Sequence, residues 1–314
     1  MTECMQLEKV GETMMLTGLQ VAVLGGDARQ IEIVRKLTEL DAKVFLIGFE
    51  QFDHFFPGAV KEKISDLNPA TIDAMILPVA GTDENGDIET IFSSETVRLD
   101  KKFLEQTPPH CTIYSGISND YLDRIVAEVD RKLVLLFSRN DVAIYNSIPT
   151  VEGTIMMAIQ HTDFTIHGSK TVVLGLGRVG MTVARTFAAL GAKVKVGARK
   201  SEHIARAEEM GYEAFYLRDI HSSVEDADIV INTIPHMVVT ASVIARMPAH
   251  TLIIDLASKP GGTDFRYAEK RGIKALLAPS LPGIVAPKTA GQILANVLAD
   301  LLRELLHKRE GTAP

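Results

Sequence analysis

The chain has few of the features that mark secreted, metal-binding or membrane proteins. It has only two cysteines, Cys4 and Cys111, and they form no CxxC or zinc-type spacing, which favours a reducing compartment. No stretch approaches the roughly 18 apolar residues of a membrane span. Residues 1–12 also lack the apolar segment of a signal peptide. These absences predict a cytoplasmic protein with no metal site and no membrane contact.

The chain also lacks excess positive charge. Its net charge of −7 argues against binding to nucleic acid or to an anionic membrane surface. With 46% hydrophobic and 23% charged residues, the composition is that of a globular protein. Its 314 residues are enough for two domains of about 150 residues each. If the substrate is an anion, this acidic chain must gather cationic donors at one place.

An internal repeat is the most informative pattern. Residues 19–29, LQVAVLGGDAR, correspond to residues 169–179, SKTVVLGLGRV, and the correspondence continues without a gap to Leu40 and Leu190. Each copy predicts a short strand, a glycine turn, a helix of about 13 residues and a second strand. This is the beginning of a doubly wound α/β domain, present twice in the chain.

Strands and helices continue to alternate through both copies, as parallel sheets require. Further strands are predicted at 74–77, 111–113, 133–137, 228–232, 251–255 and 272–276, and helices at 119–129 and 149–160, the latter with Pro149 in its first turn. The predicted fold is therefore α/β, with two doubly wound parallel-sheet (Rossmann-like) domains and a closing C-terminal helix. The predicted ranges are an N-terminal domain at 15–147, a dinucleotide-binding domain at 148–288, and a helix at 289–308 that returns to the N-terminal domain.

The second copy contains the glycine pattern Gly175-x-Gly177-x-x-Gly180. The first glycine allows the tight turn, the second lets backbone amides approach a pyrophosphate, and the third permits close helix–strand packing. The phosphates are expected at the N-terminus of the helix that begins near Arg178. In the first copy the equivalents of Gly177 and Gly180 are Asp27 and Gln30. Only the second copy is therefore predicted to bind a dinucleotide.

The end of the second strand in this copy favours NADP over NAD. NAD-binding domains place an acid there for the ribose 2′-hydroxyl, whereas this chain has Arg199, Lys200 and Ser201, which suit a 2′-phosphate. The predicted cofactor-binding residues are Gly175, Leu176, Gly177, Arg178, Val179, Gly180, Ala198, Arg199, Lys200, Ser201, Thr233, Ile234, Pro235, Ala257 and Ser258.

Two loops at strand ends contain candidate catalytic residues. Residues 232–236 and 255–262 follow the fourth and fifth strands of the second domain, and both are expected to face the nicotinamide. His236 could transfer a proton near neutral pH, and Lys259 could bind a substrate carboxylate. The alternatives are that His236 caps the next helix and that Lys259 is a solvated loop lysine.

Candidate substrate-binding residues lie in both halves of the chain. Arg29 is expected at the carboxyl end of the first strand, although Asp27 could simply cap the helix there and leave Arg29 in solvent. Near the predicted helix start at 149, side-chain donors lie beside a helix N-terminus, which favours anions. Together with the proline-rich loop 278–289, they predict a cleft for a small anion. Its predicted members are Asn146, Ser147, Thr150 and Ser280.

Five segments taken together resemble the dipicolinate synthase A-subunit family. They are residues 25–29, 146–153, 175–180, 255–262 and 281–290, within a resemblance that covers residues 16–308. It implies NADP-dependent oxidation of dihydrodipicolinate, a lysine-pathway intermediate, to dipicolinate in the mother-cell cytoplasm of spore-forming bacteria. It also implies a partner, the flavoprotein-like B-subunit of dipicolinate synthase. The catalytic base, the need for this partner, and the choice between dihydrodipicolinate and its hydrated precursor stay open.

Three other functions compete with this interpretation. A D-2-hydroxyacid dehydrogenase shares the two-domain shape but needs an Arg, Glu and His set that has no clear place here. A methylenetetrahydrofolate dehydrogenase has a loop like residues 281–287 but needs a Tyr-x-x-x-Lys, which no tyrosine of this chain provides. A non-catalytic NADP-binding subunit remains compatible with the sequence. By analogy with two-domain dehydrogenases, a homo-oligomer is expected.

Overall fold

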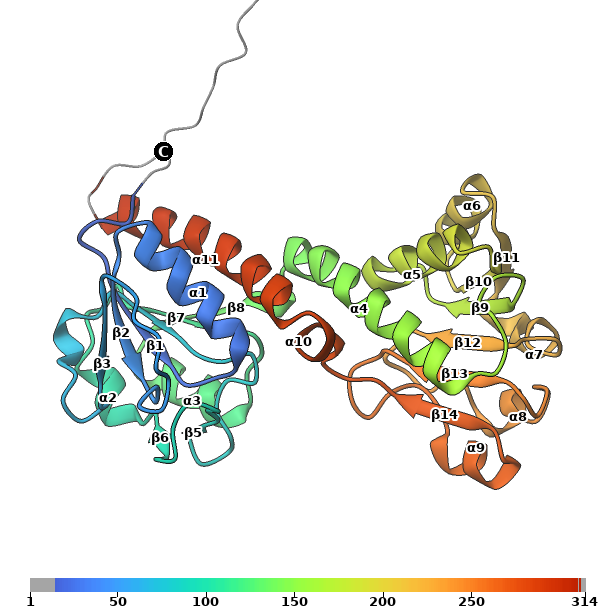
Figure 1. Ribbon diagram of the computed structural model, residues 1–314, viewed down its shortest axis with the longest axis horizontal. Helices are drawn as coiled ribbons and strands as arrows, with labels where there is room; N and C mark the ends of the chain where they lie inside the picture. The colour runs from blue at the N-terminus through green and yellow to red at the C-terminus, as the bar shows by residue number, and fades with distance from the viewer. Residues whose placement is uncertain (1–14, 310, 312–314) are drawn as a thin grey trace, which may run out of the picture. The chain divides into compact units, whose positions relative to one another are not determined.

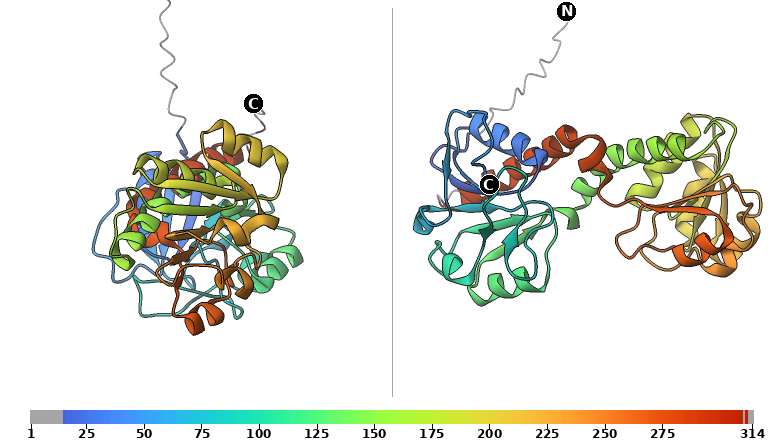
Figure 2. Two further views of the ribbon diagram at one scale, coloured as in Figure 1. Left: turned by 90° about the vertical axis from the view of Figure 1, so that its right-hand side faces the viewer. Right: turned by 60° about the horizontal axis from the view of Figure 1, so that its bottom comes forward.

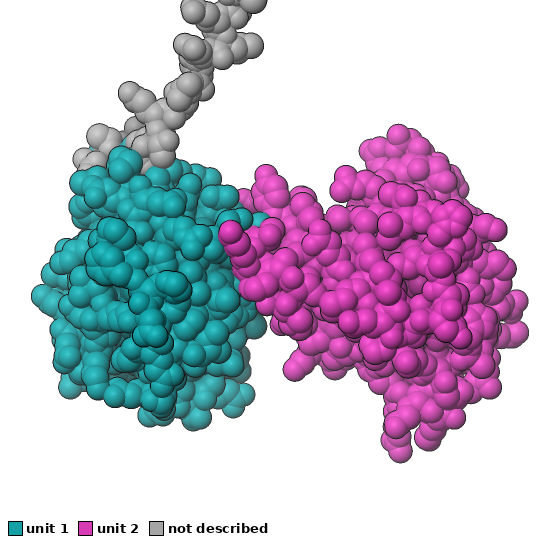
Figure 3. Space-filling view, viewed as in Figure 1, with its two compact units in different colours: residues 1–138, 291–314 teal, residues 139–290 magenta. Residues whose placement is uncertain are grey.

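The computed structural model describes residues 15–309 and 311, so Cys4 and the segment 1–12 lie outside the described residues. The chain forms two compact units, residues 1–138 with 291–314 and residues 139–290 (Figure 3). Each unit contains one six-stranded parallel sheet with helices on both faces (Figure 1), which confirms the predicted fold class. No helix in the described part of the chain is both long and apolar enough to cross a membrane.

The sheet of unit 1 has the strand order β3-β2-β1-β4-β7-β8. Its strands are β1 (Gln20–Leu24), β2 (Lys43–Ile47), β3 (Ala59–Glu62), β4 (Ala74–Ile76), β7 (Thr112–Ser115) and β8 (Lys132–Leu135). A short antiparallel hairpin, β5 (Asp87–Ile88) and β6 (Val97–Arg98), lies outside the sheet. The sequence did not predict β3, because this edge strand is largely exposed and has no apolar run.

Helices cover both faces of this sheet. They are α1 (Ala28–Glu39), α2 (Lys101–Glu105), α3 (Asp120–Glu128) and the part of α11 (Pro287–Arg309) that begins at Gly291. On one face, Leu104 of α2 and Leu122 of α3 join the buried core beneath the strands. Figure 2 shows α1 and α11 side by side. The last helix of the chain therefore completes the unit that the first strand begins.

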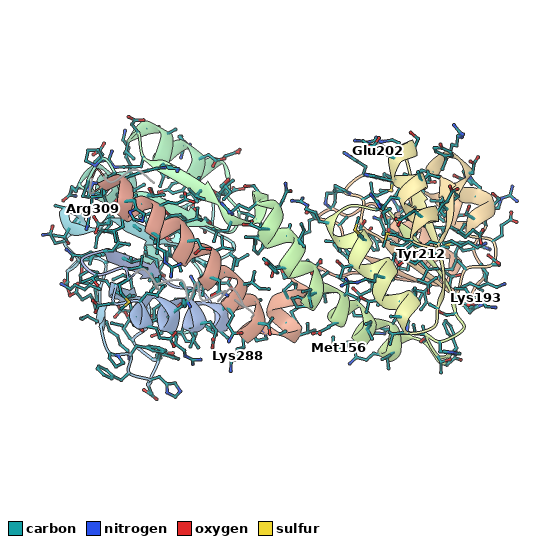
Figure 4. All side chains as sticks on the ribbon, turned by 90° about the horizontal axis from the view of Figure 1, so that it is seen from above. Met156, Lys193, Glu202, Tyr212, Lys288 and Arg309 are labelled. Atoms are coloured by element: carbon teal, nitrogen blue, oxygen red, sulfur yellow. The ribbon has the colours of Figure 1, made fainter. Side chains whose placement is uncertain are left out.

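Contacts at both ends fix α11 on unit 1. Near its start, a Cβ added to Gly291 would lie 2.6 Å from the carbonyl oxygen of Arg29, and Gln292 donates a hydrogen bond to Glu32 at 3.1 Å. At its other end, Arg309 (Figure 4) donates to the Gly18 carbonyl and to Asp73, each at 3.1 Å. These contacts hold α11 so close to α1 that a side chain at position 291 would collide with the backbone of Arg29.

Gly291→Ala is expected to destabilise the protein although alanine is the better helix former. Helix propensity favours the change by up to about 1 kcal/mol, but the new methyl meets backbone of α1, which has little freedom to move. We expect the free energy of unfolding to fall by about 1–3 kcal/mol, as for other overpacked sites. Thr289→Ala, at an exposed position of the same helix, is the control in urea unfolding. A stabilised Gly291→Ala variant would show that α11 does not pack this closely.

The sheet of unit 2 has the equivalent order β11-β10-β9-β12-β13-β14. Its strands are β9 (Lys170–Leu174), β10 (Lys193–Ala198), β11 (Glu213–Tyr216), β12 (Ile229–Asn232), β13 (Leu252–Asp255) and β14 (Lys274–Leu277). Its helices are α4 (Asn140–His161), α5 (Arg178–Ala189), α6 (Ser201–Glu209), α7 (Ile220–Ser223), α8 (Ala241–Ile244), α9 (Phe265–Arg271) and α10 (Leu281–Val285). Alternate strand residues, such as Val173 and Val172, enter two separate cores, one on each face.

The predicted helix at 149–160 is wrong in its start. Helix α4 begins at Asn140, so Pro149 lies inside it and has no N–H to donate to the carbonyl one turn earlier. The hydroxyls of Ser147 and Thr150 donate to the neighbouring carbonyls of Ile144 and Asn146, at 2.6 and 2.7 Å. The helix packs against α5, and this packing maintains it through the proline. Residues 139–147 consequently belong to unit 2.

The proline-rich segment 278–289, predicted as a loop, is more regular than expected. It contains α10 and the first turn of α11. Pro282 stands in the first turn of α10, and Pro287 opens α11. Prolines are tolerated at these positions because the first helical N–H groups have no partner inside the helix.

Candidate nucleotide-binding site

The turn between β9 and α5 has a different requirement at each glycine. Gly175 has a φ of +97°, a conformation that favours glycine. A Cβ on Gly180 would lie 2.0 Å from the Gly175 carbonyl oxygen, so only glycine fits. A Cβ on Gly177 would meet nothing within 4 Å. The turn is thus closely packed at Gly175 and Gly180 and open at Gly177. The open side lies at the N-terminus of α5, where backbone N–H groups favour an anion.

A cavity of about 470 Å³ lies beside this turn, within unit 2. Nine of the predicted cofactor residues line it: Gly175, Leu176, Gly177, Ala198, Arg199, Lys200, Thr233, Ile234 and Pro235. Six do not: Arg178, Val179, Gly180, Ser201, Ala257 and Ser258. Among these six, Gly180 contributes through close packing, and the Arg178 guanidinium donates to Asn140 at 3.1 Å.

One end of the cavity is cationic. Arg199 is exposed, and its side chain makes no hydrogen bond or ion pair with any other residue that the structure describes. Lys200 lies 3.3 Å from Glu202, and both side chains are exposed, so this ion pair is weak. His203, in the first turn of α6, also lines the cavity and was missed from the sequence. A phosphate group at this end would find three nitrogen-bearing side chains.

The rest of the lining is largely apolar. Leu217 and Val238 join Ile234 on the cavity wall, and neither was predicted. Leu217 follows β11, and Val238 lies beyond the end of β12, so only the folded sheet brings them together. Apolar lining residues beside a cationic end suit a purine ring that carries a phosphorylated ribose.

In unit 1 the equivalent turn is closed by the chain itself. The Gly26 N–H donates to the Glu89 carbonyl at 2.8 Å, and the Ile91 N–H donates back to Gly26 at 3.0 Å. A Cβ added to Gly25 would lie 2.8 Å from the same Glu89 carbonyl. The segment 88–91 therefore occupies the space in front of this turn.

Arg29, predicted to bind substrate, is engaged with Asp27. The Asp27 carboxylate caps α1 by accepting from the Arg29 N–H at 3.0 Å, and the two side chains form an ion pair at 2.6 Å. Burial acts to raise the pKa of Asp27, but the hydrogen bonds and charge of Arg29 outweigh it and lower the pKa below its ordinary value. The structure favours the capping alternative for Asp27, with Arg29 as its ion-pair partner.

The predicted anion cleft loses its physical basis. Asn146, Ser147 and Thr150 lie in the interior of α4, so no helix N-terminus faces an anion there. Ser147 is buried and shares a 2.7 Å hydrogen bond with Thr182. Ser280 has a left-handed conformation with φ of +60° just before α10, a short helix that packs against α4. The helix-start argument for Asn146, Ser147 and Thr150 was therefore wrong.

The two candidate catalytic residues are both exposed in unit 2. His236 lines the cavity, and it does not cap the next helix, because Thr240 is the residue at the N-cap of α8. Lys259 does not line the cavity, and within residues 15–309 it makes no ion pair. Both loops begin at buried polar residues, Asn232 and Asp255, to which the sequence assigned no role.

Comparisons with known proteins agree with this geometry. Residues 20–137 match the N-terminal domain of the dipicolinate synthase A-subunit, and residues 145–313 match the alanine dehydrogenase/PNT C-terminal domain. The second match implies a nicotinamide dinucleotide as the cofactor, consistent with the cavity beside the glycine turn.

Three relatives are similar over nearly their whole length. The chain is 64% identical to the dipicolinate synthase A-subunit of Bacillus subtilis (strain 168), over 93% of this chain and 98% of the relative. The crystal structure of the dipicolinate synthase A chain from Bacillus subtilis has 63% identity and a TM-score of 0.92, covering 94% of this chain and 99% of that chain. The structure of the A-subunit from Bacillus halodurans has 62% identity and a TM-score of 0.90, covering 92% and 99%. The chain belongs to the dipicolinate synthase A-subunit family.

Proposed function

We propose that the chain is an NADP-dependent dehydrogenase that oxidises dihydrodipicolinate to dipicolinate. The observation that carries this proposal is the cavity of unit 2, which has an open glycine turn and a cationic end, in a chain whose relatives are named dipicolinate synthase. When bound, the oxidised dinucleotide supplies a hydride acceptor. The amides at the N-terminus of α5 and the side chains of Arg199, Lys200 and His203 are the groups that would hold it.

The preference for NADP over NAD is supported by the groups that follow β10. NAD-binding domains place an acid there to accept from the ribose 2′-hydroxyl. Here the strand ends at Ala198, and Arg199 and Lys200 follow it. The nearby acid, Glu202, lies against Lys200 rather than on the cavity wall. These groups favour a 2′-phosphate, whereas a bare 2′-hydroxyl would find no carboxylate among the described residues that line the cavity.

In the proposed reaction, the main task of the protein's residues is to position the substrate against the cofactor. Loss of a hydride and a proton makes the substrate ring aromatic, so holding the dicarboxylate in the correct orientation can provide most of the catalysis. Lys259 is the proposed contact for a carboxylate, and His236, on the cavity wall, is the proposed group that moves the proton.

The test is turnover by the purified chain. Dihydrodipicolinate is generated in the cuvette from pyruvate and aspartate semialdehyde with its synthase, and reduction of NADP and of NAD is followed separately. Dipicolinate is identified by its ultraviolet spectrum and its calcium complex. Product formed with NADP preferred supports the proposal.

A second candidate function is a non-catalytic NADP-binding subunit, since Lys259 does not line the dinucleotide cavity. Tight NADPH binding without turnover by the chain alone would favour this candidate. Addition of the partner subunit then separates the two candidates. If the partner alone forms dipicolinate at the same rate as the mixture of partner and this chain, the dehydrogenase proposal is refuted. The family relation also supports, as proposals, a B-subunit partner, a homo-oligomer, and work in the mother-cell cytoplasm of a sporulating bacterium.

Lys259→Ala is expected to raise the KM for dihydrodipicolinate about 10- to 100-fold, the effect of losing one charge-assisted contact. The Kd for NADPH should stay within about twofold, because Lys259 lies off the cavity wall. Lys270→Ala, another exposed lysine of unit 2, is the control in steady-state kinetics. Unchanged kinetics in Lys259→Ala would remove this residue from the substrate site.

A further inference from the structure

Two buried polar residues stand at the carboxyl ends of neighbouring interior strands of the unit 2 sheet. Asn232 is the last residue of β12 and Asp255 the last of β13, and the two are paired in register. Both are completely buried, with 0% exposed surface. A buried carboxylate is unfavourable unless other groups satisfy it, so the surroundings of Asp255 must compensate for its burial.

Four neutral donors converge on the Asp255 carboxylate. One oxygen accepts from Asn232 Nδ2 and the Ala257 N–H, both at 3.0 Å, and the other accepts from the Gly262 N–H at 2.8 Å and from Thr263 Oγ1 at 2.6 Å. Only a carboxylate can accept at both oxygens, because an amide would direct its own N–H groups at two of these donors. The hydrogen bonds that the Asp255 side chain accepts therefore close the loop 256–263, which contains Lys259.

Asn232 does the same for the preceding loop. Its Oδ1 accepts from the Ile234 N–H at 3.0 Å, and its Nδ2 donates to the Ile234 carbonyl at 3.1 Å as well as to Asp255. These bonds shape the first turn of the segment that leads to His236. The Asn232 side chain thus contacts the N–H and the carbonyl of Ile234 in its own loop. It also contacts the Asp255 carboxylate, which closes the other loop.

The two loops also touch directly at Gly262. A Cβ there would lie 2.3 Å from the His236 carbonyl oxygen and 2.6 Å from that of Ile234. The N–H groups of Val238 and Val239 both donate to the Gly262 carbonyl, at 3.0 and 2.9 Å. A shift of either loop would therefore be transmitted to the other.

We propose that Asn232 and Asp255 are a positioning pair that sets the spacing between the loops containing His236 and Lys259. Neither residue needs to touch substrate or cofactor for this role. This proposal rests on the proposed function for the identity of the bound substrate. The hydrogen bonds between the two loops do not depend on that identity.

The test uses Thr263, because it can be changed without leaving a charged residue unpaired. Thr263→Val keeps the shape but removes the hydroxyl that donates to Asp255, and Thr263→Ser is the matched control that keeps the hydroxyl. We expect Thr263→Val to lower kcat and to weaken dipicolinate binding to the NADPH complex, each about 10-fold, because small misplacements of reacting groups are costly. The Kd for NADPH should stay within about twofold, and Thr263→Ser should be close to wild type.

A purely structural role predicts a different result. If Thr263→Val only lowers the melting temperature while kcat, KM and dipicolinate affinity of the folded protein match wild type, the proposal is overturned.

Hydrogen exchange separates this proposal from the proposed function. In Asn232→Ala, which removes both the acceptor of the Ile234 N–H and the donor to Asp255, the Ile234 and Gly262 amides should lose protection together, because one pair holds both loops. Loss at Ile234 alone would overturn the positioning pair even if the enzyme is active. If wild type neither turns over dihydrodipicolinate nor binds dipicolinate, the proposed function fails, and the exchange result alone decides whether the pair joins the loops.

Discussion

Gly177→Ala is expected to weaken NADPH binding about 100-fold while the melting temperature stays at the wild-type value. The backbone at Gly177 has a φ of −86°, which alanine adopts readily, and a Cβ would meet no protein atom within 4 Å. The added methyl would instead stand in the open space before the N-terminus of α5, where we place the pyrophosphate. Loss of close amide contacts worth about 2.7 kcal/mol corresponds to this 100-fold change.

Gly180→Ala is the contrasting variant for the same turn. Its methyl would lie 2.0 Å from the Gly175 carbonyl oxygen, so the turn or the helix must shift. We expect the free energy of unfolding to fall by about 3 kcal/mol, at the upper end for an overpacked site. NADPH titration by fluorescence, with thermal unfolding of both variants, checks the pair. A Gly177→Ala protein that binds NADPH as tightly as wild type would contradict the placement of the pyrophosphate at this turn.

Arg199→Ala is expected to lower the preference for NADP over NAD about 100-fold. A guanidinium that binds a phosphate makes charge-assisted hydrogen bonds worth about 1.5–3 kcal/mol. Arg199 has no competing partner in the part of the chain that the structure describes, so its full interaction is available to a 2′-phosphate. The kcat/KM for NADP should fall while that for NAD stays nearly constant, and steady-state kinetics with each cofactor measures both.

The two other side chains at the cationic end provide graded controls. Lys200→Ala should have a smaller effect than Arg199→Ala, because the ammonium of Lys200 already lies beside Glu202 at 3.3 Å. His203→Ala should reduce the NADP preference without affecting NAD, since His203 lines the same end of the cavity. Equal use of NAD and NADP by the wild-type chain would refute the 2′-phosphate site altogether.

The sequence predicted the elements whose signal is local. Buried strands such as β9 and β12 are short apolar runs that end at glycine or polar residues, and the repeated glycine turn aligned the two sheets. The edge strands β3 and β11 and the hairpin near residue 90 lack such runs, and the sequence did not predict them. Pro149 misled the prediction because contacts with α5 maintain a helix that local propensity would begin later.

The candidate site likewise contains residues that a local sequence pattern predicts and residues that only the folded structure brings together. The glycine turn and the basic residues after β10 are contiguous in sequence, so their roles could be predicted. His203, Leu217 and Val238 reach the cavity from three different elements, and nothing local marks them. The importance of Asp255 emerges only when Gly262 and Thr263 fold back on it, which is a tertiary event.

The closed turn of unit 1 has a consequence for how many cofactors a chain can hold. Residues 88–91 are covalently attached to the glycine turn that they fill, so they act as a tethered competitor. Because the segment belongs to the same molecule as the turn, its local concentration there does not fall when the protein is diluted. A free dinucleotide in the cell would have to displace a ligand that can never diffuse away. With the turn of unit 1 occupied by its own chain and the turn of unit 2 open, we expect equilibrium dialysis with NADPH to find one bound dinucleotide per chain.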